Sequence, residues 1–333
     1  MTTLRLIARL VPAAALLLTA GFALAPRAAS AQSVDPALLD VVTTAFTETA
    51  AVASLSIQSQ TVTETEGLPQ GFQIGQQETV SAQLARSGDD WNLTRTSTTV
   101  LTTPQGETRI ASELIVVDGV TYIRFSEAPE AMADGLPTTW ANAADLALGD
   151  GGAADALVSA DPLGELSLPI DAAAILSLTE LQSADMDGQP MRVIQVSLDP
   201  AAILESEAAA LVTGAAGGLG GGMGAGGFPG GPGGEGMPAL PEGVTPPQGG
   251  ALPEGMTPPA DGEAPEVTAE DFEMTFAVYI GANDGLIHRI YRVIAIAPSA
   301  GDQGMALSFT TTTLTNYADF NAPITISAPT LGQ

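Results

Sequence analysis

Residues 272–298 read FEMTFAVYIGANDGLIHRIYRVIAIAP, and residues 305–320 read MALSFTTTTLTNYADF. The first stretch begins with apolar side chains at every second position, namely Phe272, Met274, Phe276, Val278 and Ile280. This alternation is typical of a β-strand that buries one face. Asn-Asp-Gly at 283–285 tolerates positive φ and predicts a tight hairpin, after which 286–298 and the Thr-rich 305–320 form two more strands. The pattern predicts an antiparallel meander with one apolar face, which another element has to cover.

The residues before this meander predict further strands and a few helices. Asp35 and Pro36 favour a helix start, with Asp35 as the N-cap. Strands are predicted over 54–65, 71–85, 91–103 and 191–198, with a hairpin over 107–125 around Asp118-Gly119. Short helices are predicted over 169–178 and from Pro200 onward. The fold class is therefore α+β, a curved antiparallel sheet of about ten strands wrapped around a few helices.

Two segments differ in composition from the rest of the chain. Residues 1–31 are typical of a signal peptide, with Arg5 and Arg9 before an apolar run and small residues at the cleavage site. Residues 214–268 are dominated by Gly and Pro and carry LPEGVTPP followed by LPEGMTPP. We expect this insert to be disordered, because it cannot bury enough apolar area to offset the entropy of ordering. We interpret 32–333 as a single domain interrupted by the insert, since the last strands need partners from before it.

The composition excludes several classes of function. The chain has 38 acidic residues against 10 arginines and no lysine, with a net charge of −28 at pH 7. Such a surface repels phosphate backbones, so we expect no nucleic-acid binding. Cysteine is absent, which excludes disulfides and thiolate sites. After residue 31 no apolar run has the length that a bilayer span needs, so we expect no stable membrane insertion once the signal peptide is cleaved.

No pattern in the sequence indicates catalysis, a metal or a cofactor. His288 is the only histidine, and because no nucleophile or orienting acid can be assigned to it, we expect a structural or surface role. The glycine-rich 217–236 lacks the lysine of a phosphate-binding loop. Asp185-Met186-Asp187-Gly188 begins like a calcium loop but lacks its later ligands, and a hairpin turn explains it better. We therefore expect neither an enzyme nor a protein with a metal or cofactor.

Several stretches resemble a known family. VYIGANDGLIHRI (278–290) and YADFNAPITISAP (317–329) resemble the C-terminus of the LppX/LprG-type lipid-binding lipoproteins (LppX, LprA, LprF and LprG), relatives of the LolA and LolB lipoprotein carriers. VVDGVTYIRF (116–125) and GQPMRVIQVSLDPAAIL (188–204) are similar to that family's middle hairpin and crossover. The resemblance implies a LolA-like half-barrel with a cavity between sheet and helices. The family's lipid-anchoring cysteine is missing, so we expect a secreted or cell-envelope protein of a bacterium that is not lipidated.

Two functions remain open at this point. The first is non-catalytic binding or carriage of a lipid or other apolar ligand in a cavity between sheet and helices. Alternation predicts that the ligand-binding residues are Leu55, Ile57, Phe72, Ile74, Trp91, Leu93, Phe276, Val278, Leu307 and Phe309. The alternative is a structural or interaction protein of the cell surface, with a filled core and the Pro/Gly-rich insert in contact with a protein partner.

Overall fold

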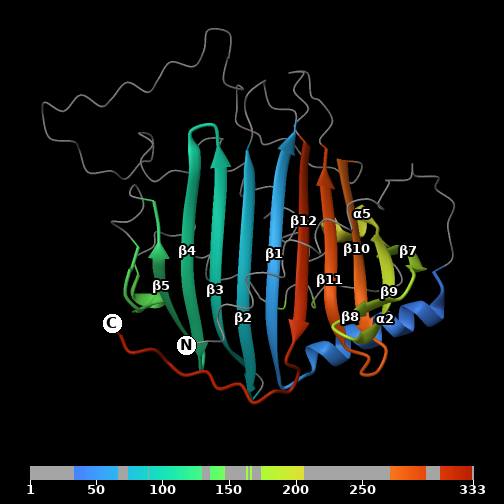
Figure 1. Ribbon diagram of the computed structural model, residues 1–333, viewed down its shortest axis with the longest axis horizontal. Coiled ribbons are helices and arrows are strands. Elements are labelled where there is room, and N and C mark those ends of the chain that lie inside the picture. Colours follow the sequence, from blue (N-terminus) through green and yellow to red (C-terminus); the bar gives the residue numbers. More distant parts are fainter. Residues whose placement is uncertain are drawn as a thin grey trace, which may run out of the picture. The chain divides into compact units, whose positions relative to one another are not determined.

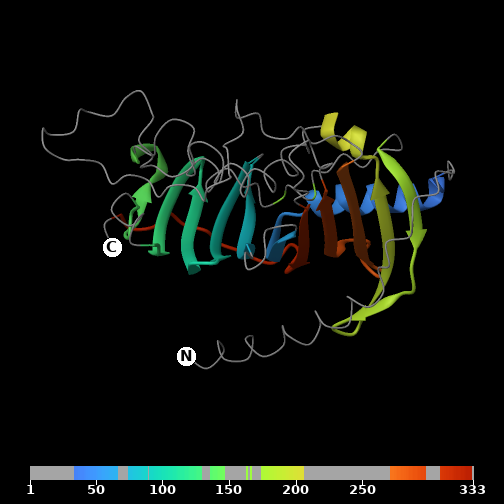
Figure 2. The same cartoon turned by 90° about the horizontal axis from the view of Figure 1, so that it is seen from above.

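The meander expected at the C-terminus forms one half of a large antiparallel sheet. The computed structural model describes residues 34–66, 74–88, 90–129, 136–146, 163, 166, 174–205, 271–297 and 308–331, which belong to one compact unit. In this part of the chain the sheet has 12 strands in the order β6-β5-β4-β3-β2-β1-β12-β11-β10-β9-β7, and β8 pairs with β9 (Figure 1). The sheet is curved and open, as Figure 2 shows from above. The predicted α+β class with a curved antiparallel sheet is confirmed.

Nine of the strands lie close to the ranges that the sequence predicts, and β6, β7 and β8 were not predicted as strands. Their bounds are β1 Ser54–Glu66, β2 Gly75–Ser87, β3 Asp90–Thr103, β4 Gly106–Val117, β5 Val120–Glu127, β6 Ala141–Asn142, β7 Ile175–Glu180, β8 Ala184–Met186, β9 Gln189–Leu198, β10 Phe272–Gly281, β11 Ile287–Ile296 and β12 Ser308–Ala318. The C-terminal meander β10-β11-β12 is confirmed by its two antiparallel pairings. The last strand, β12, pairs antiparallel with the first strand, β1, so residues from the two ends of the domain join the two halves of the sheet.

The predicted helix starts are both observed. Helix α2 (Pro36–Ala50) begins with Asp35 as N-cap, whose side chain accepts a hydrogen bond from Ala37 N–H. The short helix α5 (Pro200–Glu205) begins in the same way, with the Asp199 carboxylate accepting from Ala201 N–H at 3.0 Å. A 3-10 turn, η2, covers Ala143–Asp145. In each Asp-Pro pair the aspartate satisfies an N–H at the helix start, and proline fixes φ at the first helical position.

The predicted hairpin turns use residues with positive φ. Asp118 and Gly119 join β4 to β5 with φ of 51° and 76°, and Asp187 and Gly188 join β8 to β9 with φ of 53° and 81°. Two successive positive φ values match the right-handed twist of the strands on either side. Asp185, whose carboxylate accepts from Gly188 N–H at 2.9 Å, therefore belongs to a hairpin turn.

One prediction about secondary structure and one about burial were wrong. Residues 175–178 belong to strand β7 and not to a helix, because β7 pairs with β9 at the end of the sheet and this pairing outweighs local helix propensity. Strand β10 buries both faces near its end, where the sequence predicts one buried face. The reason is that Tyr279 and Ala277 pack on the other side against Met191 and Val193, in a cluster that Leu181, Ala184 and Met186 adjoin. The predicted signal peptide (1–31) and the insert (214–268) lie outside the described residues.

The helices lie near one end of the sheet. The main contacts of α2 are with β7 and β11, and those of α5 are with β10. Figure 2 shows both helices beside the β7–β11 half of the sheet. Among the residues that the structure describes, neither helix has its main contacts with β2 to β5. We call the sheet face that carries Phe276 the inner face, and the opposite one the outer face.

Within the described ranges, no helix is long and apolar enough to cross a membrane.

Candidate functional site

The inner face of the sheet gathers the side chains that the sequence assigns to ligand binding. Directly paired residues of antiparallel strands share a face, so the register places Leu55 with Leu84 and Leu93 in one row across β1, β2 and β3. Ile57, Phe276 and Val278 belong to the same buried core cluster as Leu55. Trp91, Leu93 and Phe309 are partly buried and pack against this cluster.

The remaining predicted residues are placed less fully. Ile74 precedes β2 and is half-buried, and its carbonyl accepts a hydrogen bond from Thr65 N–H at 3.3 Å. Phe72 and Leu307 lie outside the described residues. The structure therefore brings most of the predicted residues together on one face, and the alternation in the sequence found that face.

Helix α2 fills the space above β10. The rings of Phe46 on α2 and Phe276 on β10 meet edge to face, with centroids 6.5 Å apart. Phe276 has no exposed surface, and Phe46 is 5% exposed. Edge-to-face packing of this kind is a favourable aromatic arrangement. At this end of the inner face the side chains themselves form a packed core.

Away from the helices, the inner face continues with buried apolar residues. Leu114 on β4 pairs directly with Ile123 on β5, and the two are 4% and 1% exposed. Phe125, also on β5, is 3% exposed. These three residues belong to neither of the two core clusters. The apolar inner face thus extends to β4 and β5, beyond the strands against which α2 and α5 pack.

A band of hydroxyl groups crosses the middle of the same face. Facing residues on β1 and β12 form three hydroxyl pairs, Ser59–Thr315 at 3.0 Å, Thr61–Thr313 at 3.2 Å and Thr63–Thr311 at 3.0 Å. A fourth pair, Ser97–Ser112 at 2.8 Å, joins β3 to β4. Buried hydroxyls are costly unless they are hydrogen-bonded, and here each hydroxyl bonds its cross-strand neighbour. We call these four pairs the hydroxyl band.

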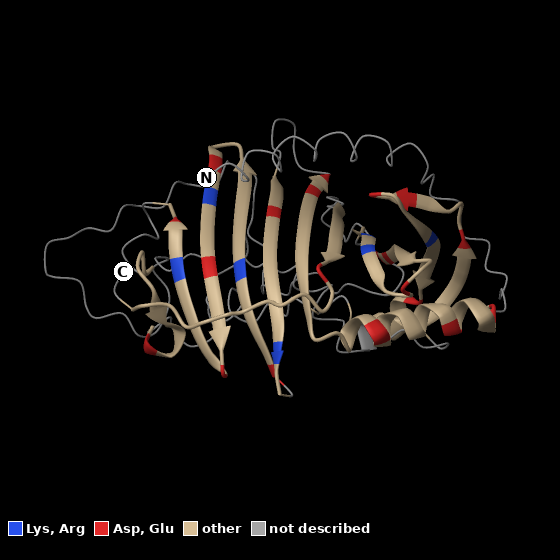
Figure 3. Ribbon diagram, turned by 60° about the horizontal axis from the view of Figure 1, so that its bottom comes forward, with Lys and Arg blue, Asp and Glu red and all other residues tan. Residues whose placement is uncertain are grey.

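Two buried arginines stand at the edges of the hydroxyl band. Arg95 on β3 and Arg292 on β11 are each 9% exposed. Arg95 Nη2 lies 3.3 Å from Glu78 Oε1 on β2, and Arg292 Nη2 donates to Thr313 Oγ1 at 3.3 Å. Figure 3 shows that charged positions are scattered singly over the strands and form no continuous patch there. Both arginines place a positive charge on the inner face, and Glu78, on the same face, pairs with Arg95.

The hydroxyl band was not predicted from the sequence, although alternating Ser and Thr residues indicate part of it. Ser59, Thr61 and Thr63 alternate along β1, and Thr311, Thr313 and Thr315 alternate along β12. Alternation shows that each set lies on one face of its strand. It does not show that the two strands are neighbours, and only their pairing turns two rows of hydroxyls into one band.

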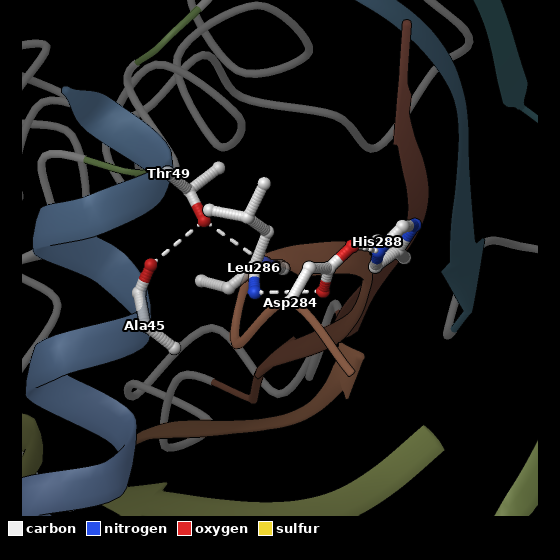
Figure 4. A network of polar contacts seen from close by, with 6 residues as sticks. Ala45, Thr49, Asp284, Leu286 and His288 are labelled. Atoms are coloured by element: carbon white, nitrogen blue, oxygen red, sulfur yellow. Dashed lines mark hydrogen bonds and ion pairs between the residues drawn. The ribbon is translucent and has the colours of Figure 1, made fainter. Parts of the chain in front are cut away.

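A polar network fixes α2 to the hairpin between β10 and β11 (Figure 4). Thr49 Oγ1 donates to the Ala45 carbonyl at 2.7 Å and accepts from Ile287 N–H at 2.9 Å. His288 Nε2 lies 2.9 Å from Asp284 Oδ2. A Cβ atom at Gly281 would collide with the Asp284 carboxylate, which explains glycine at this position.

His288 also contacts the segment that follows β12. Its ring packs edge to face on Phe320, with centroids 5.1 Å apart. The side chain of His288 is 15% exposed. The ring thus bridges the hairpin and the C-terminal segment, which is consistent with the structural role expected from the sequence.

A shallow pocket lies between α2 and this hairpin. It has a volume of about 260 Å³ and is lined by residues that include Asp40, Glu48, Arg192 and Gly281. Arg192 is held on the other side by Glu180 through two hydrogen bonds of 2.9 and 3.2 Å. Hydrogen bonding from Arg192 lowers the pKa of Glu180. The volume is smaller than the about 300–1,000 Å³ of common ligand pockets, and within the described ranges no three metal-ligating side chains cluster.

The outer-face cluster around Tyr279 perturbs two titratable groups. Arg289 lies 5.6 Å from the centroid of the Tyr279 ring and donates to Asn316 Oδ1 at 2.7 Å. Burial raises the pKa of Tyr279, although the charge of Arg289 acts in the opposite direction. Burial likewise lowers the pKa of Arg289. Both shifts follow from packing, because a buried phenol or guanidinium loses the hydration of its charged form.

No protein-family model matches this chain, and no curated protein matches its sequence. Among solved structures it is similar to the lipoprotein LppX of Mycobacterium tuberculosis, at 10% identity and a TM-score of 0.36, over 88% of this chain and 100% of LppX. It is similar to LprF from Mycobacterium bovis at 13% identity and a TM-score of 0.35, over 90% of this chain and 99% of LprF. A DUF1329 family protein from Desulfovibrio piger is similar at 6% identity and a TM-score of 0.23, over 87% and 94% of the two chains. LppX and LprF bear names of the lipoprotein group that the sequence resembles.

Proposed function

We propose that this protein binds the apolar chain of a lipid on the inner face of its sheet, without catalysing a reaction. The observation that carries the proposal is a row of buried apolar side chains on the inner face of β4 and β5, Leu114, Ile123 and Phe125, which are at most 4% exposed. A sheet face of this kind needs an apolar cover, and the main contacts of α2 and α5 lie elsewhere in the sheet. Because these side chains are already buried, a lipid chain would bind there by taking the place of the protein atoms that cover them, and burial of its surface contributes about 25 cal/mol per Å².

The proposal includes a location and a set of partners. Residues 1–31 act as a signal peptide that directs the chain to the cell envelope or the exterior. The mature chain is not lipidated, because it has no cysteine to carry the anchor. Its ligand is a lipid or another hydrophobic small molecule, and the Pro/Gly-rich 214–268 is the segment through which a protein partner is contacted.

A second function is favoured by one contact. Phe46 packs on Phe276 with no exposed surface left on Phe276, as in a core that needs no ligand. If the whole inner face is filled in this manner, the protein is a structural or interaction protein of the cell surface. The two functions differ in whether a lipid chain binds at the inner face of β4 and β5.

The test uses the complete mature protein, without residues 1–31, and a long-chain fluorescent lipid. Leu114→Trp enlarges a side chain on the inner face, whereas Ile115→Trp makes the same kind of change at the next residue, on the outer face of β4. We expect wild-type protein to take up the probe saturably, Leu114→Trp to weaken uptake at least tenfold, and Ile115→Trp to bind normally. Thermal melts of the three proteins separate loss of binding from loss of fold.

Native mass spectrometry of protein purified from its own host gives an independent reading. A co-purifying lipid mass supports carriage. No saturable uptake by wild-type protein, together with a ligand-free mass, would reject lipid binding and leave the surface protein with a filled core.

A further inference from the structure

We propose that Arg95, Ser97 and Ser112 form a subsite for the uncharged, oxygen-rich end of an amphipathic lipid, of the chemical class of the acylglycerols. This inference rests on the proposed function, because the subsite has a role only if the apolar chain is bound beside it. It adds a polar end to the ligand and assigns a place for that end on the sheet.

The first observation is a buried donor with no partner. Arg95 is 9% exposed, and its Nη2 is engaged with Glu78 Oε1 at 3.3 Å. Its Nε atom is buried and has no hydrogen-bond partner. Leaving a buried N–H donor unsatisfied costs about 1–3 kcal/mol. An acceptor oxygen on a ligand would remove that cost.

The second observation is the position of Arg95 between apolar and polar parts of the inner face. Its direct cross-strand neighbours are Ala82 on β2 and Leu114 on β4. On its own strand the same face carries Leu93 toward one end and Ser97 toward the other. A lipid with its chain against Leu114 therefore has its polar end within the reach of Arg95.

The hydroxyl band supplies the rest of the subsite. Ser97 and Ser112 lie 2.8 Å apart and are each 7% exposed. In such a pair one hydroxyl donates to the other, and the accepting hydroxyl keeps its own hydrogen for a third group. The subsite thus offers an N–H donor and a hydroxyl donor next to each other, together with hydroxyl oxygens that accept.

The charges of the subsite select an uncharged ligand group. Glu78 forms an ion pair with Arg95, and its side chain, 31% exposed, lies on the same face of the sheet as Arg95. A lipid carboxylate or phosphate would meet this like charge, which disfavours binding. Ester carbonyls and glycerol hydroxyls accept and donate hydrogen bonds without a charge. The pair therefore favours an acylglycerol over a fatty acid anion.

The experiment measures the displacement of a fluorescent apolar probe from the full mature protein by three ligands of similar chain length. These are monooleoylglycerol, oleate and 1-octadecene. We expect wild-type protein to prefer monooleoylglycerol to the other two. Arg95→Met keeps the length of the side chain and removes the donor. Its matched control is Arg109→Met, which breaks the exposed ion pair of Arg109 with Glu127, 3.1 Å long, on the outer face.

Arg95→Met is expected to weaken monooleoylglycerol binding about tenfold, the loss of one hydrogen bond to a charged group, and to leave 1-octadecene binding unchanged. Arg109→Met is expected to change neither affinity. Equal losses for both ligands, or no loss for monooleoylglycerol, would overturn the subsite. Uptake of 1-octadecene without any preference for monooleoylglycerol overturns the subsite alone, whereas absence of any uptake overturns the proposed function as well.

Oleate binding by Glu78→Gln is a second and independent test of the subsite, and it replaces the first test if Arg95→Met does not fold. Glutamine keeps a hydrogen-bond acceptor for Arg95 and removes the negative charge. We expect oleate binding to rise about tenfold, because the Arg95 charge is then available to the carboxylate. Unchanged oleate affinity in a folded Glu78→Gln protein contradicts the assignment.

Discussion

Thr49 on α2 accepts a hydrogen bond from the backbone N–H of Ile287 at the start of β11, over 2.9 Å. Thr49 has no exposed surface, and its hydroxyl donates in turn to the Ala45 carbonyl at 2.7 Å. A single hydroxyl thus satisfies a strand N–H that would otherwise be buried without a partner. This bond fixes the helix against the hairpin that begins the C-terminal meander.

Replacement of Thr49 by valine tests this bond. Thr49→Val keeps the shape of the side chain and leaves Ile287 N–H unpaired, so we expect a loss of about 1–3 kcal/mol in the free energy of unfolding. Thr47→Val is the matched control, because Thr47 is exposed and its hydroxyl bonds only the Thr43 carbonyl of its own helix. Urea denaturation measures both, and equal losses would show that the bond to Ile287 contributes nothing.

Truncation of Phe276 measures how tightly the inner face is packed beneath α2. Because Phe276 is fully buried against Phe46, Phe276→Ala is expected to lower the free energy of unfolding by about 3–5 kcal/mol. Phe309→Ala, at a half-buried position of the same face, should cost clearly less. A cost for Phe276→Ala below that range would mean that its side chain borders a cavity and not a filled core.

The phenol of Tyr279 makes stability sensitive to alkaline pH. Its pKa is raised by burial above the ordinary value of 10.0 in the unfolded chain. The neutral phenol is therefore favoured by folding, and this contribution is complete below about pH 10 and is lost as pH rises through the raised pKa. Tyr279→Phe should flatten the decline in melting temperature above pH 10. Tyr122→Phe, at a half-buried position, is the control, and identical alkaline profiles for Tyr279→Phe and the wild type would contradict the prediction.

Deletion of residues 214–268 tests the interpretation of the insert. We expect the deletion variant to fold with nearly unchanged melting temperature, because loop-closure cost changes by only about 0.6 kcal/mol per doubling of loop length. The flanking elements, α5 and β10, remain complete in this variant. Circular dichroism and a thermal melt are sufficient, and a variant that does not fold would assign a structural role to the insert.

The sequence by itself determined most of the strands, the main turns and the inner face. Alternation along 272–280 identified Phe276 and Val278 as neighbours on one face, and Asp-Gly pairs identified the turns at 118–119 and 187–188. These features depend on the order of nearby residues, because side-chain direction along a strand and positive φ in a turn are local properties. The same is true of the Asp-Pro helix starts.

Only the tertiary structure decided which strands are neighbours and what their pairing creates. Thr61 and Thr313 are 252 residues apart and lie 3.2 Å from each other because β1 pairs with β12. Residues 175–178 form a strand because β9 is available beside them, although their local sequence favours a helix. Pairings between distant segments follow from the burial of the whole sheet, which no local pattern encodes. The hydroxyl band and the apolar surface around Leu114 exist only at that level, and the proposed ligand site depends on both.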